Sequence, residues 1–307
     1  MLRNSVVYFM EVARIGSIRA ASASLGVAQS AISRQIQALE YEIGAPVIER
    51  YSHGVRLTPS GEALFRHARL ASYEIERLVS ELDDMRGTSH SRVHVAVVES
   101  LTSYVFPRAI KAFLDRYPDN TLIVEVGKSD AVLEAVMRDA ADFGVCVNAP
   151  SSAAVDVLAR FAEPLFAIVP PNHPLCYERQ IGLAELSKHP LALSSRSTGV
   201  GYALDLACSK AELSLEATLE TNSIELLRQF VSSGCGIAVM TRQSCLGSLL
   251  ESHFTALRIQ DIHLDMISSD VVVAQGRKLP LPSERFMSSV MAELKRSVQD
   301  SSTPVSE

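Results

Sequence analysis

A regular apolar repeat over residues 64–85 most strongly constrains the fold of this chain. Apolar side chains recur there at alternating intervals of four and three residues, which is the pattern of a helix that packs along a partner helix. The alternative is a lone helix that packs on its own domain. The narrow stripe favours a long helix with a dimer seam, which is formed by Leu64, Ala68, Ala71, Ile75, Leu78, Leu82 and Met85.

The flanking residues indicate where this helix begins and ends. Thr58 supplies a hydroxyl cap, and Pro59 occupies the first turn, where its missing N–H costs nothing. Gly87 stops the helix, and the polar residues 88–91 form a hinge. We therefore expect three parts, which are residues 1–58, a linker and dimerisation helix over residues 59–88, and residues 89–307.

Three short amphipathic helices are predicted before the long helix. The spacing of apolar residues defines them, and Gly16, Gly26 and Gly44 end them. Ser17 caps the second helix. The third helix runs from about residue 28 to residue 43, and its predicted buried side consists of Ile32, Ile36, Leu39 and Ile43.

A short hairpin follows the third helix. Residues 47–51 and 55–58 are typical of two strands, and Gly54 lies in the turn between them. Three helices followed by such a hairpin indicate a winged helix-turn-helix. On the hairpin, the side chains predicted to contact phosphates or the minor groove are Arg50, His53 and Arg56.

The third helix carries a polar stripe opposite its apolar side. The stripe follows helical spacing, so its side chains share one face. Arginine can bond guanine with two hydrogen bonds, glutamine can pair with adenine, and serine can bond either base. A solvated helix face is the alternative. The residues predicted to read DNA in the major groove are Gln29, Ser30, Ser33, Arg34 and Gln37.

The charge of the chain is unevenly distributed. The whole chain has a formal net charge of −6, which is unusual for a DNA-binding protein. Residues 1–69, however, hold eight arginines and five acidic residues, a local net charge of +3. The acidic residues lie mainly in the remainder, where a domain that senses metabolites can tolerate them.

From residue 92 onward, strands and helices alternate in the α/β manner, and we expect a parallel sheet. Two runs of this kind favour two lobes over one. The first lobe is expected at about residues 92–162 together with 268–300, and the second at about 163–267. The strands predicted most clearly are residues 93–98, 122–126, 143–147, 166–169, 191–193, 237–240 and 271–274.

The N-terminal motifs resemble the DNA-binding signature of LysR-type transcriptional regulators. They are SIRAA at 17–21, QSAISRQI at 29–36, LE at 39–40 and LTPSG at 57–61, together with Leu25, Gly44 and Arg50. The sequence departs from the family pattern at Ala28, Pro46 and Ile48. Looser matches follow, which are FPR at 106–108, Phe113, YP at 117–118, DFGV at 142–145, NHPL at 172–175 and GCGIA at 234–238.

This resemblance implies an effector domain similar to a two-lobed periplasmic binding protein, with its ligand in the cleft. Hydroxyl groups at helix starts and the fork of Arg196 favour a small anion, either an organic acid or an amino acid. The alternative is that these hydroxyls only cap their helices. The positions that correspond to the cleft are Ser100, Leu101, Thr102, Cys146, Val147, Ser194, Ser195, Arg196, Ser197, Thr198, Thr221, Asn222 and Ser223.

Several partners follow from the seam and the resemblance. A dimer would place two recognition helices on one duplex, so an interrupted inverted repeat is the expected target. The family implies that dimers pair into tetramers, and RNA polymerase is a further candidate partner. The sequence carries no apolar run that predicts a membrane span and no secretion signal, so we expect a cytoplasmic protein.

The residues favour no catalytic, cofactor or metal site. Partial glycine fingerprints lack their third glycine, and the common hydrolase, nucleotide and zinc motifs are missing from the sequence. The five cysteines are odd in number and scattered. Two alternatives stay open, which are an enzyme with an accessory DNA arm and a regulator that responds to oxidants through Cys208, because one peroxide-sensing branch of the family uses cysteines in its second lobe.

Overall fold

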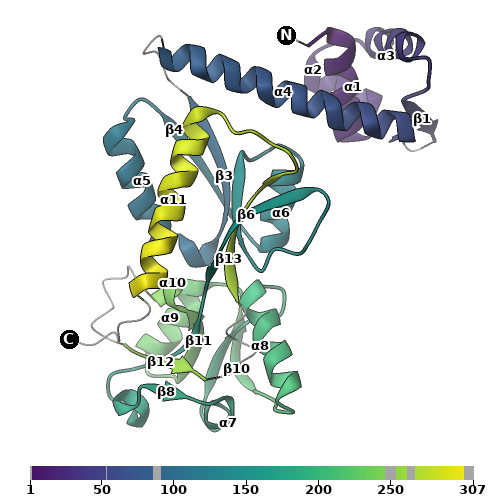
Figure 1. Ribbon diagram of the computed structural model, residues 1–307. Helices are drawn as coiled ribbons and strands as arrows, with labels where there is room; N and C mark the ends of the chain where they lie inside the picture. Colours follow the sequence, from purple (N-terminus) through teal and green to yellow (C-terminus); the bar gives the residue numbers. More distant parts are fainter. Residues whose placement is uncertain (1, 53, 86–90, 246–253, 261–266, 301–307) are drawn as a thin grey trace. The chain divides into compact units, whose positions relative to one another are not determined.

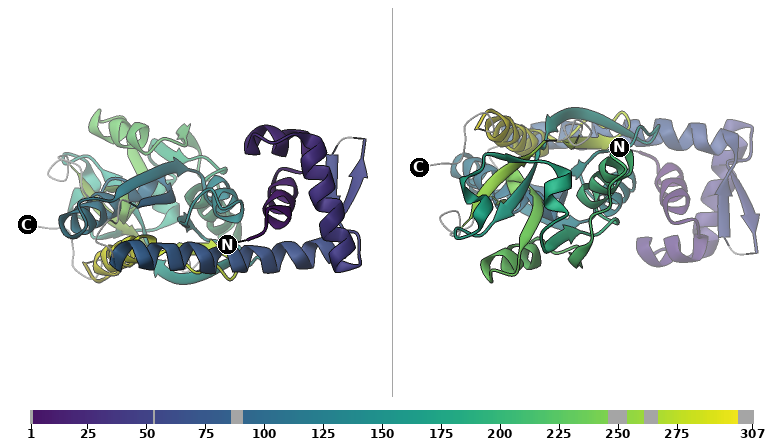
Figure 2. Two further views of the ribbon diagram at one scale, coloured as in Figure 1. Left: turned by 90° about the horizontal axis from the view of Figure 1, so that it is seen from above. Right: turned by 90° about the horizontal axis from the view of Figure 1, so that it is seen from below.

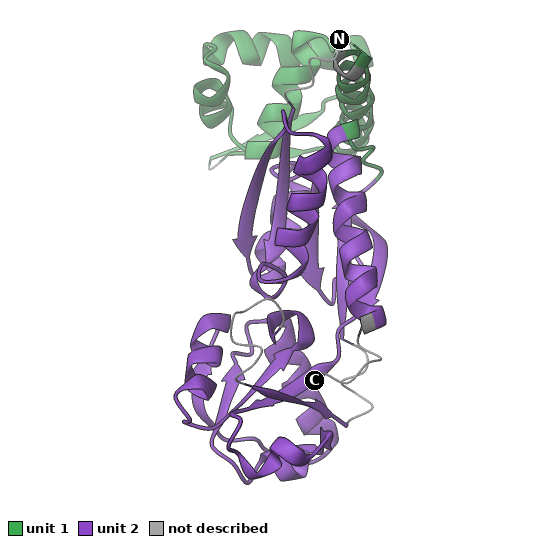
Figure 3. Cartoon of the chain, turned by 90° about the vertical axis from the view of Figure 1, so that its left-hand side faces the viewer, with its two compact units in different colours: residues 1–89, 276–281 green, residues 90–275, 282–307 purple. Residues whose placement is uncertain are grey.

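The computed structural model describes residues 2–52, 54–85, 91–245, 254–260 and 267–300. The chain is divided into two units, which Figure 3 shows in different colours. Unit 1 comprises Met1–Ser89 and Gly276–Leu281, and unit 2 comprises His90–Gln275 and Pro282–Glu307. Each unit is described by itself below.

Unit 1 begins with the three predicted helices. Each ends at a glycine in the left-handed conformation, with φ of +73° at Gly16, +65° at Gly26 and +77° at Gly44, which side chains other than glycine adopt at a cost. The hydroxyl of Ser17 accepts a hydrogen bond from the N–H of Ala20, so it caps the second helix. The helices are α1 (Asn4–Ile15), α2 (Ile18–Leu25) and α3 (Gln29–Ile43).

The core of unit 1 lies between these helices and the hairpin. On α3 the apolar period holds for Ile32, Ile36 and Leu39, which are buried. Ile43 is exposed, so its predicted place in the core was wrong, because the helix ends there beyond its last packing neighbour. The other buried apolar residues of this core are Phe9, Val12, Ala21, Val47 and Ile48.

The hairpin consists of β1 (Ile48–Tyr51) and β2 (Gly54–Leu57), which pair antiparallel. Its start is fastened to α3, because the carboxylate of Glu40 accepts hydrogen bonds from the N–H of Val47 at 2.9 Å and of Ile48 at 3.3 Å. The hydroxyl of Thr58 then donates to Pro46 O at 2.6 Å. These contacts set the position of the hairpin beside α3.

Helix α4 (Pro59–Met85) is the long helix that the apolar repeat predicted. Figures 1 and 2 show the three small helices and the hairpin around its N-terminal part. Along the seam, Ala68 is buried, whereas Leu78 is 53% exposed and Met85 is 84% exposed. Unit 1 alone therefore leaves the second half of the apolar stripe uncovered.

Unit 1 also includes the segment Gly276–Leu281, which packs on α4. The ammonium of Lys278 pairs with the carboxylate of Glu74. The guanidinium of Arg277 lies over the ring of Tyr73, 4.7 Å from its centroid. A cation over an aromatic face is attracted by the ring, so these contacts hold the segment against the helix.

Lobe one of unit 2 contains a five-stranded sheet in the order β4-β3-β5-β13-β6. Strand β3 runs parallel to β4 and β5, whereas β13 runs antiparallel to β5 and β6, so the parallel sheet that we predicted is mixed. Helix α11 contributes Phe286 to an aromatic cluster with Phe106, Phe113 and Phe143. The strands are β3 (Arg92–Val98), β4 (Thr121–Gly127), β5 (Phe143–Val147), β6 (Val155–Ala162) and β13 (Ser268–Ala274), and the helices are α5 (Val105–Arg116), α6 (Ser129–Met137) and α11 (Leu281–Asp300).

Lobe two contains a six-stranded sheet in the order β10-β9-β11-β7-β12-β8. The strands β9, β10 and β11 are parallel, and β7 is antiparallel to β11 and β12. The strands are β7 (Leu165–Val169), β8 (Gln180–Ile181), β9 (Leu191–Ser194), β10 (Ala217–Thr221), β11 (Ile237–Thr241) and β12 (Thr255–Ile259), and the helices are α7 (Leu183–Leu186), α8 (Gly199–Lys210), α9 (Ile224–Ser232) and α10 (Arg242–Cys245).

The chain passes between the lobes after β6 and again before β13. The two crossings touch, because the N–H of Glu163 donates to Ile267 O at 2.8 Å and the hydroxyl of Ser269 donates to the Glu163 carboxyl at 3.0 Å. Burial raises the pKa of Glu163 to about 8, which the hydrogen bonds from Ser269 and Gln243 oppose. At neutral pH, a neutral carboxylic acid therefore lies where the two lobes join.

Candidate functional site

The polar stripe on α3 is exposed in unit 1. Gln29, Ser30, Arg34 and Gln37 are exposed, and Ser33 is half-buried. The Nε of Arg34 donates to Ser30 O at 3.3 Å, and the side chain is exposed. The residue before the helix, Ala28, contributes no side-chain cap, which leaves first-turn N–H groups for another acceptor such as a phosphate.

The hairpin arginines are also exposed, but they lie on opposite faces. Arg50 pairs across the hairpin with Val55, and Arg56 pairs with Glu49. Residues directly opposite in an antiparallel pair share a face, and successive residues alternate. The guanidinium of Arg56 lies over the ring of Tyr51, 5.1 Å from its centroid. His53, which we also predicted to contact DNA, lies outside the described residues.

In unit 2, a cavity of about 230 Å³ lies between the two lobes. Lobe one contributes residues that follow β3 and β4, and lobe two contributes residues at the starts of α8 and α9. Gly199 allows the lobes to approach closely, since a Cβ there would lie 2.8 Å from the Cβ of Val147. Among the predicted effector residues, those that line the cavity are Ser100, Val147, Ser194, Thr198 and Asn222.

The other predicted effector residues do not line this cavity. Leu101 and Cys146 are fully buried in the lobe-one core. The remaining hydroxyls bond their own loops, since Thr102 donates to Glu99 O at 2.8 Å, Thr221 accepts from Ser223 N at 3.1 Å, and Ser195 shares a hydrogen bond with Ser197 at 2.9 Å. For these hydroxyls, local turn bonding competes with a role toward a ligand.

Arg196 does not lie in the cleft either. Its side chain is 77% exposed and pairs with the carboxylate of Asp205 on α8. Both residues border a second hollow on lobe two, which Cys208 also lines. The guanidinium that we expected to hold an anionic effector therefore pairs with α8 and does not line the cleft.

The cleft contains polar residues that the sequence analysis missed, which are Glu99, Lys128 and Ser129. Glu99 follows β3, and Lys128 and Ser129 follow β4, which runs parallel to β3. The hydroxyl of Ser129 bonds the backbone of Val147, with both N and O at 3.2 Å. Because the carboxyl ends of parallel strands meet at one sheet edge, the rule that pointed to Ser100 could also have found these residues.

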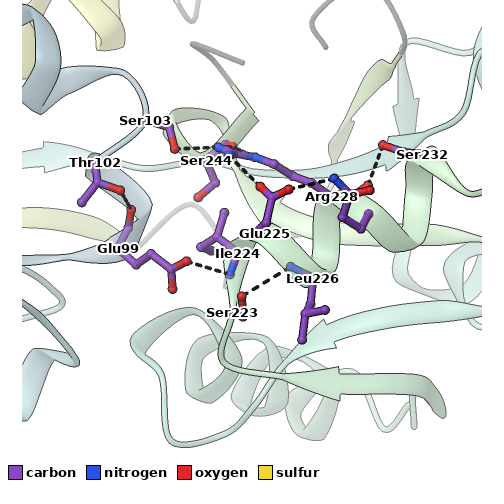
Figure 4. A network of polar contacts seen from close by, with 11 residues as sticks. Glu99, Thr102, Ser103, Ser223, Ile224, Glu225, Leu226, Arg228, Ser232 and Ser244 are labelled. Atoms are coloured by element: carbon purple, nitrogen blue, oxygen red, sulfur yellow. Dashed lines mark hydrogen bonds and ion pairs between the residues drawn. The ribbon is translucent and has the colours of Figure 1, made fainter. Parts of the chain in front are cut away.

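Polar contacts cross the cleft between the lobes (Figure 4). The carboxylate of Glu99 accepts from the N–H of Ile224, the first residue of α9, at 3.2 Å. The guanidinium of Arg228 donates to the hydroxyl of Ser103 at 2.8 Å. In addition, the ammonium of Lys128 donates to the hydroxyl of Ser197 at 2.9 Å. In this structure, hydrogen bonds therefore connect the two lobes around the cavity.

Three helices begin at the cavity, which are α6, α8 and α9. The N-terminus of a helix carries a partial positive charge and N–H groups without helical partners. Together with the ammonium of Lys128, these helix starts favour an anionic group in the cleft. Among the described residues we find no cluster of His, Cys, Asp and Glu that could hold a metal ion.

Three of the five cysteines, which are Cys146, Cys208 and Cys245, lack the properties of a redox switch. Burial raises the pKa of the Cys146 and Cys245 thiols to about 12, so both stay protonated and weakly reactive at neutral pH. Cys208, the residue of the redox alternative, is 6% exposed. A thiol that senses oxidants has to be accessible, so this burial disfavours the alternative.

Comparisons with known families decide the identity of the chain. Residues 4–62 match the family described as "Bacterial regulatory helix-turn-helix protein, lysR family", and residues 86–295 match the family described as "LysR substrate binding domain". The chain belongs to the LysR family. It is therefore a DNA-binding transcriptional regulator of the LysR type with an effector-binding domain, as the N-terminal signature indicated. Members of the family are regulators and not enzymes.

Curated relatives match three quarters of the chain or more. The RuBisCO operon transcriptional regulator of Allochromatium vinosum is 26% identical over 94% of this chain and 95% of its own length. The transcriptional dual regulator GltC of Bacillus subtilis is 28% identical over 76% of this chain and 78% of its own length.

Solved LysR-type structures share the fold. Full-length OxyR from Pseudomonas aeruginosa is similar with a TM-score of 0.66 at 18% identity, covering 96% of this chain and 95% of that protein. Full-length CbnR complexed with its target DNA is similar with a TM-score of 0.54 at 20% identity, covering 96% of this chain and 100% of that protein. The Synechocystis CcmR regulatory domain in complex with 2-PG is similar with a TM-score of 0.58 at 20% identity, covering 67% of this chain and 98% of that domain. These likenesses confirm the predicted winged helix-turn-helix and two-lobed effector domain. In the described ranges, no helix has the length and apolarity to cross a bilayer.

Proposed function

We propose that this regulator binds an interrupted inverted repeat in duplex DNA as a homodimer formed through α4. The observation that supports this most is the exposed stripe Gln29, Ser30, Arg34 and Gln37 on α3, opposite the buried Ile32 and Ile36. Its side chains can bond base edges, and a second copy would place the same stripe one or more helical turns away. The similar CbnR was solved with its target DNA, which supports this mode of binding.

Selection of tight-binding duplexes from a random library by the purified full-length protein tests this proposal. The recovered sequences should share two half-sites in inverted orientation. The mass of the protein on the selected duplex, measured by sedimentation, should correspond to an even number of subunits. A protein that stays monomeric and binds every duplex equally weakly at low ionic strength would contradict the proposal.

We propose further that a small anionic metabolite binds the cleft between the lobes and changes the affinity for DNA. Support comes from the cavity itself, the three helix starts at it, and the ammonium of Lys128. At about 230 Å³, the cavity is smaller than the roughly 300–1,000 Å³ of sites for drug-sized ligands. The CcmR domain in complex with 2-PG supports a small ligand at this scale.

Thermal unfolding of the full-length protein in the presence of small carboxylates and phosphates tests the effector proposal. A ligand that binds only the folded state raises the midpoint with its concentration. The same compound should then shift the midpoint of a titration against the selected duplex. A panel in which every anion leaves both midpoints unchanged would count against an anionic effector.

The assembly and its location complete the proposal. Pairing of dimers into tetramers, contact with RNA polymerase and action on DNA in the cytoplasm agree with the family of the chain. The uncovered residues Leu78, Leu82 and Met85 on α4 offer the surface for association between subunits.

A further inference from the structure

The cleft between the lobes contains two opposite charges. Among the residues that line the cavity, Glu99 and Lys128 are those with charged side chains. They follow the neighbouring parallel strands β3 and β4, so both belong to lobe one. Each reaches a different part of lobe two, since Glu99 bonds the start of α9 and Lys128 bonds Ser197 before α8. The cavity therefore has an acidic side and a basic side.

Between these charges the wall is mostly apolar, with a few polar groups. Val98, Val126, Val147 and Val200 line the cavity. Ser100 also lines it, and its hydroxyl has no hydrogen-bond partner among the described residues, although Ser100 is only 7% exposed. A hydroxyl that lines the cavity and has no partner in the described protein is available to bond a polar ligand.

The present partners of the two charges are neutral. Glu99 accepts from the backbone N–H of Ile224, and Lys128 donates to the hydroxyl of Ser197. Each of these bonds has one ionised partner, and an oppositely charged partner would add a Coulombic attraction that is strong in a cleft with little water. A ligand that carries both charges can therefore replace these partners at a gain, whereas a ligand with one charge satisfies one side alone.

We propose that the cleft selects a small zwitterion of the size of an α-amino acid, whose anionic group pairs with Lys128 and whose cationic group pairs with Glu99. This inference rests on the effector site proposed above and narrows its ligand. A second negative charge would face the carboxylate of Glu99 in a cleft with little water, where like charges repel strongly. The wall and volume between the charges leave room for a short side chain.

The same two side chains also bond the lobes to each other, and this function needs no ligand charge at all. The two explanations differ in what the protein discriminates. If Glu99 and Lys128 only fasten the lobes, their substitution lowers stability but leaves the relative affinities of ligands unchanged. If they read a zwitterion, each substitution alters the preference for one end of the ligand.

The test uses the full-length protein and the L-amino acids, each added singly in thermal unfolding and calorimetric titration. For an amino acid that binds, we compare the matching carboxylic acid without the amine and the matching amine without the carboxylate. The loss of one charged hydrogen bond is expected to weaken binding by roughly tenfold to one hundredfold in each case. Failure of all the amino acids to bind would overturn the proposal.

Two variants of the cleft residues show which side chain binds which charged group of the ligand. For Glu99→Gln, removing the amine from the ligand should weaken binding by no more than about threefold, whereas removing the carboxylate should weaken it as much as in the unsubstituted protein. For Lys128→Gln, the effects of the two removals should be exchanged. Glu134→Gln and Lys111→Gln, which change exposed ion pairs on lobe one, are the controls and should keep both penalties. Unchanged penalties in both cleft variants would overturn the proposal.

The outcome also separates this inference from the proposed function. If inorganic phosphate or a dicarboxylate binds through Lys128 while the amino acids do not, the zwitterion proposal fails and the anionic effector cleft stands. If neither class changes the unfolding midpoint, the proposed effector function fails as well. Binding to the selected duplex is measured independently of both results.

Discussion

Single side chains set the position of α3 relative to the hairpin. The carboxylate of Glu40 holds the N–H groups of Val47 and Ile48, and the hydroxyl of Thr58 connects Pro46 O to the N–H of Gly61. Both residues belong to the motifs that resembled the family signature. Their contacts are structural, so the signature contains residues that position the hairpin as well as residues that we propose read DNA.

The two classes of arginine should differ in their effect on specificity. Arg34→Ala should weaken binding to the selected duplex by about 1–3 kcal/mol and relax base preference, because Arg34 lies on the helix that we propose reads bases. Arg50→Ala should weaken binding to matched and scrambled duplexes alike, because phosphate contacts carry little sequence information. Anisotropy titrations of both variants on both duplexes measure this. Equal losses for the two variants on every duplex would contradict the assignment.

Gly61 should tolerate no side chain. A Cβ at this position would lie 1.9 Å from the carbonyl oxygen of Val47, a backbone atom that cannot move aside cheaply. Gly61→Ala should therefore destabilise unit 1 by roughly 1–3 kcal/mol or more, as overpacking does. Gly182→Ala is the control, since nothing lies within 4 Å of the corresponding Cβ. Urea unfolding measures both, and equal stabilities would refute the close approach.

Much of the candidate site could not be found from residue types alone. Ser100, Val147, Thr198 and Asn222 were predicted from strand ends and helix starts, and they line the cavity. Arg196 was chosen for its chemistry, but its partner Asp205 lies nine residues further along the chain and draws it away. Glu99 and Lys128 were overlooked because their importance depends on contacts with the other lobe, which local sequence patterns do not show.

At the scale of elements, the apolar period predicted helices and central strands well. Residues 143–147 were predicted as a strand, and β5 is Phe143–Val147. The strands β6, β8, β10 and β12 were missed. Strands β6 and β10 lie at sheet edges, where β6 alternates between buried and exposed residues and β10 is largely exposed, so their apolar signal is weak. The antiparallel direction of β13 follows from the return of the chain from lobe two, which no local pattern indicates.

The uncovered stripe on α4 leads to a prediction about assembly. Leu78→Glu should raise the dissociation constant of the dimer by about tenfold or more, because it would bury an unpaired carboxylate in the seam. Val79→Glu is the matched control, since Val79 is the next residue, is also exposed, and lies outside the seam. Sedimentation equilibrium of both variants measures the change. Dimers of equal strength would place the interface elsewhere.

At the scale of the whole molecule, the two lobes are joined where Glu163 is buried. Its pKa of about 8 in the folded protein exceeds the ordinary value of 4.5 that applies to an exposed carboxyl group. The folded state therefore keeps a proton that the unfolded chain loses. Stability contributed by this proton is fully present below about pH 4.5 and is lost as the pH rises toward 8.

Glu163→Gln should remove this pH dependence, because the amide is uncharged and of similar shape. The stability of the variant relative to the unsubstituted protein should increase between about pH 5 and pH 8 by an amount on the order of a few kcal/mol. Urea unfolding at several pH values across this range measures the difference. A constant offset between the two proteins would show that Glu163 does not hold the proton.

The position of β13 between β5 and β6 has a consequence for synthesis on the ribosome. Lobe two lies within the sequence of lobe one, so its six strands emerge from the ribosome before residue 268 does. Lobe two can therefore fold before β13 is available to pair with β5 and β6. A chain that ended before Ser268 would expose two unpaired strand edges, and such edges promote aggregation.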